Sequence, residues 1–281
     1  MSTILIAVIL GVVEGLTEFL PVSSTGHLIV VGHLLGFRGE AADSFDIFIQ
    51  MGAILAVVVY YRGWLWETIT AAIGFTAESA ENAERTSNAL PDPAQARRTL
   101  LGILLAVLPA LVAGAGLHGV IKRHLFQPWT VAVGLVAGGV AIFAVERWRP
   151  EARTLDLGRV TLRQAALIGA GQCLALWPGV SRSAATILSG LCLGLDHPTA
   201  AAFSFLLSIP TLTAAAAYDL LKSWHVLSGG DLLAMGVGFV ASFAVAWGVI
   251  AGFLEFLRTH GLRAFGWYRM AVGAVILWLK P

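Results

Sequence analysis

The sequence predicts an all-α polytopic membrane protein whose two halves form an inverted-topology repeat. Hydrophobic residues make up 57% of the 281 positions and charged residues only 12%, a balance typical of chains that cross a bilayer several times. Six apolar segments are long enough to cross the hydrocarbon core, and two more are interrupted near their middle. Residues of one half recur in the other at a constant interval of 158 positions.

The first half, residues 1–147, begins with an apolar stretch from 4 to 37 that Pro21-Val-Ser-Ser-Thr-Gly26 interrupts. Proline, glycine and hydroxyl residues end a helix, and each remaining piece is too short to cross a membrane alone. We therefore predict a re-entrant helix-loop-helix whose irregular backbone lines a protein cavity. The stretch lacks a basic leader and a small-residue cleavage pattern, so we expect it to be retained in the mature protein. Three predicted spans follow, at 44–61, 99–118 and 128–146.

The connection from 62 to 98 is polar and predicts a cytoplasmic amphipathic element or loop. Its charged residues include Glu78, Glu81, Glu84 and Arg85.

The second half, residues 160–281, repeats the plan of the first within one integral membrane domain. Its re-entrant hairpin is predicted at 164–195, interrupted by Pro178-Gly-Val-Ser-Arg-Ser183, and its three spans at 200–221, 231–256 and 264–280.

The repeat is supported by matches that run without a gap through the hairpin and the following span. The matching pairs are Ala7 and Ala165, Gly11 and Gly169, Leu16 and Leu174, Ser23 and Ser181, Ile29 and Ile187, Gly32 and Gly190, Gly36 and Gly194, Phe45 and Phe203, and Tyr60 and Tyr218. An odd number of spans in each half forces the second half to insert upside down. The two broken segments are then expected to meet near the midplane and form a site there.

The distribution of basic residues predicts the orientation. Five lie on the side that holds both termini, namely Arg38, Lys122, Arg123, Lys222 and Lys280. Eleven lie on the other side, namely Arg62, Arg85, Arg97, Arg98, Arg147, Arg149, Arg153, Arg159, Arg163, Arg258 and Arg263. The positive-inside rule makes the second side cytoplasmic, so both termini and the opening of the site are expected on the outer side. A formal net charge of +1 argues against a nucleic-acid-binding surface.

The two cysteines, Cys173 and Cys192, fall in apolar runs without metal-ligand spacing, so neither a disulfide nor a zinc site is predicted.

Glu14 and Glu18 are more informative, because acids inside a bilayer are costly and are retained mainly where they function. Four residues apart on a helix, they share one face. They suit a divalent cation such as Mg2+ completed by phosphate oxygens. The alternative is a cavity-lining pair satisfied by backbone amides and water.

The turn after these acids offers three hydroxyls, Ser23, Ser24 and Thr25, which can cap the next half-helix. A half-helix that starts there directs its amide groups and positive dipole end toward the cavity, which favours a phosphate. Ser24 and His27 lie within one helical turn, so they form a candidate pair of nucleophile and proton-transfer group. The alternative for the histidine is a hydrogen-bonded polar side chain without a catalytic role.

The second hairpin contributes Ser181, Arg182, Ser183 and Thr186. The guanidinium of Arg182 is a planar fork suited to bidentate phosphate binding, and its alternative role is a structural ion pair with one of the acids. The hydroxyls either cap the half-helix or bind phosphate oxygens. Together the two hairpins supply acids, hydroxyls, a histidine and an arginine, which suits phosphoryl transfer on a lipid-borne substrate.

At these two motifs the chain resembles the undecaprenyl-diphosphatase family, also called bacitracin-resistance proteins. The motifs read Glu14-Gly-Leu-Thr-Glu18-Phe-Leu-Pro-Val-Ser-Ser-Thr-Gly-His27 and Pro178-Gly-Val-Ser-Arg182-Ser, the second preceded by Gln172 and Ala175-Leu176. The resemblance extends over essentially the whole chain. One departure is Ala184, where the family usually has glycine, and it leaves every polar group in place.

The resemblance implies hydrolysis of undecaprenyl diphosphate to the monophosphate and inorganic phosphate in the bacterial plasma membrane. This step recycles the lipid carrier for peptidoglycan synthesis and confers bacitracin resistance. By position in the motifs, Glu14 and Glu18 would hold a divalent cation, Mg2+ or alternatively Ca2+, and help to orient water. Ser24 would be the nucleophile or a phosphate ligand, His27 would transfer protons, and Arg182 would clamp the diphosphate. The substrate would also be bound by the hydroxyl residues of the two loops, namely Ser23, Thr25, Ser181, Ser183 and Thr186.

Three other functions are compatible with parts of the pattern. Inverted repeats with broken helices are typical of transporters, so the same site could move undecaprenyl phosphate between leaflets. A phosphatidic-acid-type phosphatase would need a different order of motifs from the one in this chain. A purely structural membrane protein has little use for clustered intramembrane polar groups. The expected partners are the polyprenyl diphosphate and membrane lipids, with a homodimer left open.

Overall fold

The computed structural model describes residues 2–37, 39–74, 92–125, 127–223 and 229–279, and these residues are largely helical, without a β-strand. Of the predicted polar connection from 62 to 98, the part from 75 to 91, which holds Glu78, Glu81, Glu84 and Arg85, lies outside them, while 62–72 and 93–98 are helical. The helices of the first part are α1 (Thr3–Thr17), α2 (Ser24–Leu34), α3 (Glu40–Tyr60), α4 (Arg62–Ala72), α6 (Pro93–His124) and α7 (Pro128–Trp148). Those of the second part are α8 (Leu162–Gln172), α9 (Arg182–Cys192), α10 (His197–Ser223), α11 (Gly229–Thr259) and α12 (Arg263–Leu279), with short 3-10 turns at Leu157–Arg159 and Cys173–Leu176.

Within the described residues, four helices are long and apolar enough to cross a membrane: α6, α7, α10 and α11. A fifth span results if α3 and α4, which meet at a bend of 69° after Tyr60, are counted together. Leucines such as Leu101, Leu104 and Leu108 of α6 are more than half exposed, as expected of side chains that face lipid. The chain is therefore an all-helical, polytopic membrane protein. The sequence predicted six spans, and the last of them corresponds to α12, which has 17 residues.

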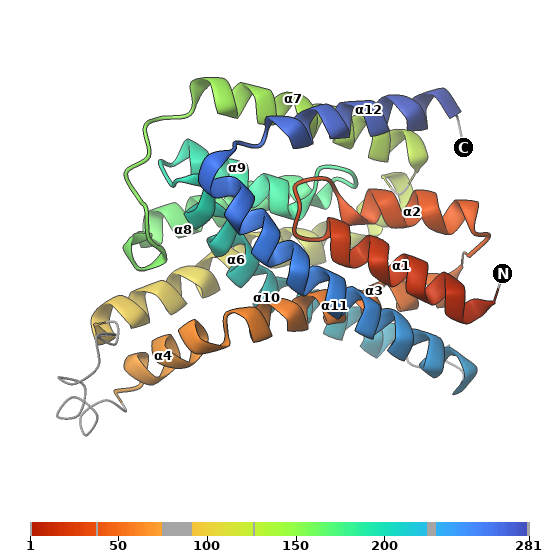
Figure 1. The fold of residues 1–281 in the computed structure, drawn as a ribbon, viewed down its shortest axis with the longest axis horizontal. Helices are drawn as coiled ribbons and strands as arrows, with labels where there is room; N and C mark the ends of the chain where they lie inside the picture. Colours follow the sequence, from red (N-terminus) through yellow and green to blue (C-terminus); the bar gives the residue numbers. More distant parts are fainter. Residues whose placement is uncertain (1, 38, 75–91, 126, 224–228, 280–281) are drawn as a thin grey trace.

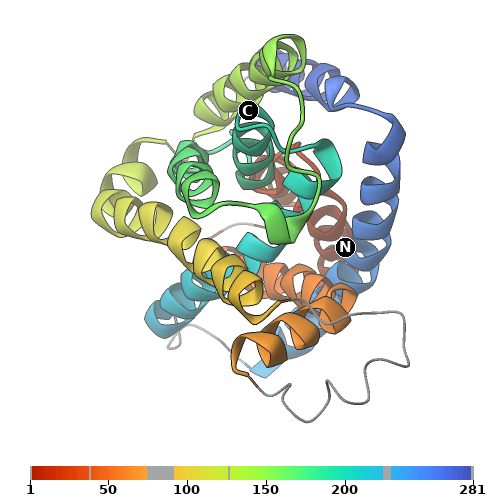
Figure 2. The ribbon, with the colours of Figure 1, turned by 90° about the vertical axis from the view of Figure 1, so that its left-hand side faces the viewer.

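The long helices pack around the short ones. α1 and α3 pack against α11, while α7 packs against α12. Figure 1 shows α12 and α7 at one edge of the molecule and α3, α4 and α10 toward the other. Turned by 90°, the structure shows α8 and α9 surrounded by longer helices (Figure 2). The largest buried hydrophobic cluster joins side chains from the helices around α9 and α10, among them Phe19, Ile187, Phe203 and Phe205. The interruptions at 18–23 and 178–181 are buried or half-buried, as backbone without helical hydrogen bonds requires in a bilayer.

Two interruptions divide the broken segments. The chain leaves α1 after Thr17 and enters α2 at Ser24, and it passes from the 3-10 turn ending at Leu176 into α9 at Arg182. Both ends of α9 lie 158 residues after the corresponding ends of α2. The start of α1 and the end of α12 lie together at one end of the molecule, on the right of Figure 1. The turns from α7 toward α8 and from α11 to α12 lie toward the opposite end.

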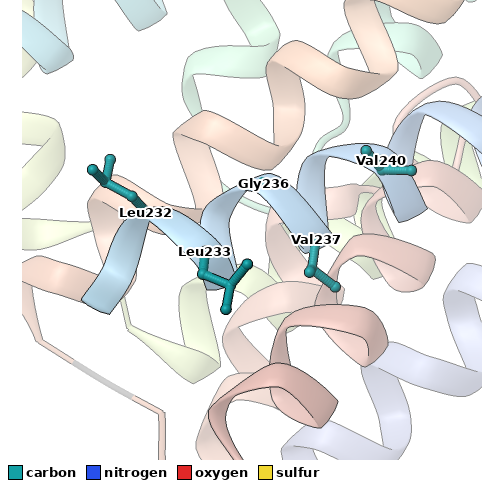
Figure 3. Close-up of a pocket in the computed structure, with 5 residues that line it drawn as sticks. All are labelled: Leu232, Leu233, Gly236, Val237 and Val240. Carbon is teal, nitrogen blue, oxygen red and sulfur yellow. The ribbon is translucent and has the colours of Figure 1, made fainter. Parts of the chain in front are cut away.

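The apolar surface of α11 carries a shallow hollow of about 480 Å3 (Figure 3). It is lined by Leu232, Leu233, Gly236, Val237 and Val240. Leu232, Leu233 and Val240 are each more than half exposed, so the hollow belongs to the outer, lipid-compatible surface. None of the predicted site residues lines it.

Candidate functional site

Each interruption ends at a serine in an unusual backbone conformation. Ser23 has φ 73° and Ser181 has φ 75°, the two non-glycine residues with positive φ in the described chain. A positive φ is strained for an L-residue with a side chain, and such strained residues are concentrated at functional sites. Each serine also caps the helix that follows, because the Ser23 hydroxyl accepts from the amide of Gly26 and the Ser181 hydroxyl from the amide of Ala184. Capping, one of the predicted roles, is thus present at both positions.

Glu18 connects the two broken segments. Its Oε1 accepts a hydrogen bond from Nη2 of Arg182 at 2.9 Å, and this contact is an ion pair between side chains that are 4% and 11% exposed. Its Oε2 accepts from the hydroxyl of Ser24 at 2.5 Å. Both carboxylate oxygens are therefore engaged by protein groups. The predicted alternative for Arg182, an ion pair with one of the acids, is the arrangement found here.

Arg182 is held from a second direction by α10. Its Nη1 donates to the carbonyl and the hydroxyl oxygen of Ser204, at 3.0 and 3.2 Å. The hydroxyl oxygens of Thr186 and Ser204 lie 2.7 Å apart, within hydrogen-bond distance. The guanidinium also lies 5.8 Å from the ring centre of Phe19. The buried Nε of Arg182 has no hydrogen-bond partner, so one donor of the guanidinium fork is not satisfied by the protein.

Most of the other predicted hydroxyls hold the loops together. Ser183 donates to the carbonyl of Leu20 at 2.8 Å and lies 2.9 Å from the Ser181 hydroxyl, so it joins the second loop to the first. Thr186 also returns a hydrogen bond to the carbonyl of Arg182, one turn back. Thr25 is exposed. The substrate contacts predicted for these groups stay predictions.

Glu14 lies on α1, one turn before Glu18, and is only 1% exposed. Neither of its carboxylate oxygens has a hydrogen-bond partner. The charges of Glu18, Asp46 and Arg182 act on it, two negative and one positive. A buried carboxylate without partners calls for a cation or a proton. The described residues contain no group of three or more His, Cys, Asp or Glu side chains that could hold a metal, so a cation at Glu14 would take most of its ligands from substrate and water.

His27 makes contacts different from those that its spacing suggested. Its Nδ1 lies 2.7 Å from the carbonyl oxygen of Ser23, and its Nε2 lies 2.7 Å from the hydroxyl of Tyr268 on α12. Ser24, the residue predicted to pair with it, donates instead to Glu18. The sequence pattern gave no sign of Tyr268, because 241 residues separate it from His27.

Arg269 is a second residue that sequence reasoning missed. It is fully buried on α12 and donates to five carbonyl oxygens. The acceptors are Pro21 of the first loop, Gly179 and Val180 of the second, and Gly134 and Leu135 of α7. A glycine at position 138 of α7 leaves room for the guanidinium, since a Cβ there would collide with it. The sequence did contain a sign of Arg269, because a charged residue within the predicted span 264–280 indicates a functional or structural role by the reasoning applied to Glu14 and Glu18.

The arrangement brings together the elements of phosphoryl transfer. A hydroxyl donates to a carboxylate, which is the geometry of a nucleophile beside its base. A guanidinium beside them can stabilise charge on a phosphoryl group. Of the predicted residues, Glu18 contacts both Ser24 and Arg182. Glu14 lies one helical turn before Glu18, and His27 is joined to the first loop through Ser23.

The chain is similar to known proteins over almost its whole length. Residues 7–275 match the family model described as bacitracin resistance protein BacA. An undecaprenyl-diphosphatase of Sorangium cellulosum is 48% identical over 278 residues, which cover 97% of this chain and 85% of that protein. Undecaprenyl-diphosphatase 1 of Bacillus cereus is 46% identical over 270 residues, 96% of each chain. The undecaprenyl-diphosphatase of Maridesulfovibrio salexigens is 44% identical over 280 residues, 99% of this chain and 98% of its own.

Proposed function

The chain belongs to the bacitracin resistance protein BacA family, and from that membership we propose that it is an undecaprenyl-diphosphatase. It hydrolyses undecaprenyl diphosphate to undecaprenyl phosphate and inorganic phosphate, which recycles the lipid carrier for cell-wall synthesis and confers bacitracin resistance. The relatives described above carry the name of a phosphatase over almost the whole length of this chain. The transporter alternative has no support among them.

The contact of Glu18 with both Ser24 and Arg182 is the observation from which we derive the site's chemistry. Ser24 would attack the terminal phosphorus while its proton passes to Glu18. The bond from that phosphorus to the bridging oxygen would break, and undecaprenyl phosphate would leave. Water would then hydrolyse the phosphoserine and release phosphate. Direct attack by a water molecule that Glu18 orients is the alternative.

Arg182 would clamp the diphosphate in this scheme. Its unpartnered Nε and its place beside Glu18 support that role, because a guanidinium binds phosphate oxygens in a planar fork. The ends of α2 and α9 that begin beside the loops carry the positive end of a helix dipole, which favours an anion. Ser23, Thr25, Ser181, Ser183 and Thr186 would contribute hydroxyls or backbone amides around the diphosphate. His27 would carry protons to or from the leaving phosphate.

A divalent cation, Mg2+ or Ca2+, would be held by Glu14 and by phosphate oxygens of the substrate. The two unpartnered carboxylate oxygens of Glu14 support this assignment. Glu18, predicted as a second ligand, has both oxygens engaged by Ser24 and Arg182, so it would bind the cation only after one of these contacts opens. When bound, the cation would neutralise charge on the transferring phosphoryl group.

We place the protein in the bacterial inner membrane as an inverted repeat, with hairpins at 4–37 and 164–195 and both termini outside. The matching ends of α2 and α9 and the matching strain at Ser23 and Ser181 support the repeat. Gln172, which lies 158 residues after Glu14, is likewise buried with unpartnered polar atoms. The site would then open outward among membrane lipids. A homodimer is a further proposal, which crosslinking in membranes would test.

Release of inorganic phosphate from undecaprenyl diphosphate by the purified wild type tests the activity. Ser24→Ala should reduce release at least a hundredfold, on the order of the loss expected for an activated nucleophile. A phosphorylated enzyme trapped by acid quench would identify Ser24 as the attacking group. Its absence, together with activity retained in Ser24→Ala, would favour direct attack by water. Binding of the lipid phosphate without any release of phosphate would overturn the assignment as a phosphatase.

A further inference from the structure

Tyr268 meets His27 in a defined geometry. The phenolic oxygen lies 2.7 Å from Nε2, and the two rings are nearly parallel, with 5° between their planes and 5.6 Å between their centres. Both helices pack against α7, because Ile29 and Val30 of α2 and Val272 and Ile276 of α12 belong to one apolar cluster with Val131, Ala132 and Leu135 of α7. Two helices distant in sequence therefore hold this contact in place.

The hydrogen bonds determine which nitrogen of His27 carries the proton. The carbonyl oxygen of Ser23 can only accept, so Nδ1 must be protonated to bond to it at 2.7 Å. In neutral His27, Nε2 is then the unprotonated nitrogen, and it accepts the hydroxyl proton of Tyr268. The tautomer of His27 is fixed from both sides of the ring.

The Tyr268 hydroxyl can hydrogen-bond to the His27 imidazole in both of its protonation states, because a hydroxyl can donate or accept. When Nε2 gains a proton, it becomes a donor, and the phenolic oxygen can accept from it after rotation of the hydroxyl proton. The contact between His27 and Tyr268 therefore persists in both states of the imidazole. An amide or carboxylate partner fixed in one role would favour one state over the other.

We propose that Tyr268 is a positioning residue, which holds His27 in one tautomer and one ring orientation for proton transfer during diphosphate hydrolysis. The inference rests on the proposed function. Through His27, Tyr268 also supports the carbonyl of the strained Ser23, the residue directly before Ser24. Tyr268 makes none of the contacts to Glu18 or Arg182 by which the site would hold the diphosphate.

The test is a double-mutant cycle on phosphate release with undecaprenyl diphosphate. Tyr268→Phe removes the hydroxyl and keeps the ring, so kcat should fall about tenfold while KM stays within about twofold. In a His27→Gln background the same change should add less than about twofold, because the residue that it positions is gone. Trp278→Phe on the same helix, whose side chain is 80% exposed, is the control for an aromatic change on α12 and should match the wild type.

Two outcomes would overturn the inference. The first is a Tyr268→Phe enzyme with wild-type kcat. The second is an equal loss from Tyr268→Phe with and without His27, which would mean that the hydroxyl acts on general stability. Thermal unfolding in detergent, measured for every variant, separates reduced turnover from reduced folding. If the wild type itself releases no phosphate, the proposed function fails; the inference alone fails if the wild type is active and Tyr268→Phe equals it.

Discussion

Glu18 and Arg182 form a buried ion pair across the two interruptions, with 2.9 Å between Oε1 and Nη2. The two residues are 164 positions apart, so the pair forms only when both broken segments are in place. Each charge reduces the cost of burying the other. A diphosphate that entered the site would compete with Glu18 for the guanidinium, and the released carboxylate would then be free to act on the Ser24 hydroxyl.

Arg182→Ala should abolish most phosphate release and destabilise the protein by about 3 kcal/mol, because it leaves Glu18 charged, buried and unpaired. Arg182→Lys should restore little activity, since an ammonium cannot form the planar fork. Arg258→Ala removes an exposed arginine of α11 and serves as the control. Wild-type turnover in both Arg182 variants would contradict the assigned clamp.

Replacing both members of the pair separates stability from chemistry. Glu18→Leu combined with Arg182→Met should recover much of the stability lost in Arg182→Ala, since apolar side chains of similar size often replace a buried pair without penalty. Phosphate release should stay at background. Thermal unfolding and turnover measured on the same preparation check both statements. Recovery of activity in the double variant would show that neither charge is needed.

Glu14→Gln should raise the concentration of Mg2+ needed for half-maximal activity by about tenfold or more, because it removes a negative charge whose oxygens no protein group occupies. Stability should be unchanged or higher, since an amide is less costly to bury than a carboxylate. Glu255→Gln changes an exposed acid on α11 and is the control for the titration. An unchanged Mg2+ titration would count against Glu14 as a ligand.

Gly138→Ala should displace Arg269, because the added methyl group would occupy the position of the guanidinium. Turnover should fall by about a hundredfold, an order of magnitude typical of a site misplaced by about 1 Å. Gly248→Ala on α11 meets no neighbouring atom and should be neutral or slightly stabilising. Activity assays on both variants check this. A fully active Gly138→Ala enzyme would show that the carbonyl contacts of Arg269 are dispensable.

A cysteine in place of Ser2 should react with an impermeant thiol reagent in intact cells, because we place the start of α1 on the outer side. The excess of basic residues on the other side of the membrane is the reason. A cysteine in place of Glu151, in the turn after α7, should react only after lysis. The reverse pattern would invert the proposed orientation.

The helical, membrane-spanning class and the interruption points were predictable because they depend on local composition, in which proline, glycine and hydroxyl residues end apolar runs. The role of Ser23 and Ser181 as caps follows from the same local rules. The contact of Ser24 with Glu18 was not predictable, because the direction of a side chain beyond a turn depends on the backbone of that turn. Spacing alone instead favoured Ser24 and His27. Tyr268 and Ser204 reach the site through packing between distant helices, which no local pattern encodes.

The contacts of Arg269 can form only after the residues that they join have been synthesised. All five carbonyls that it binds belong to residues made earlier by the ribosome, since the acceptors lie at positions 21 to 180. Until α12 has inserted, both loops and α7 lack this shared donor. We therefore expect turnover only from chains in which α12 is in place.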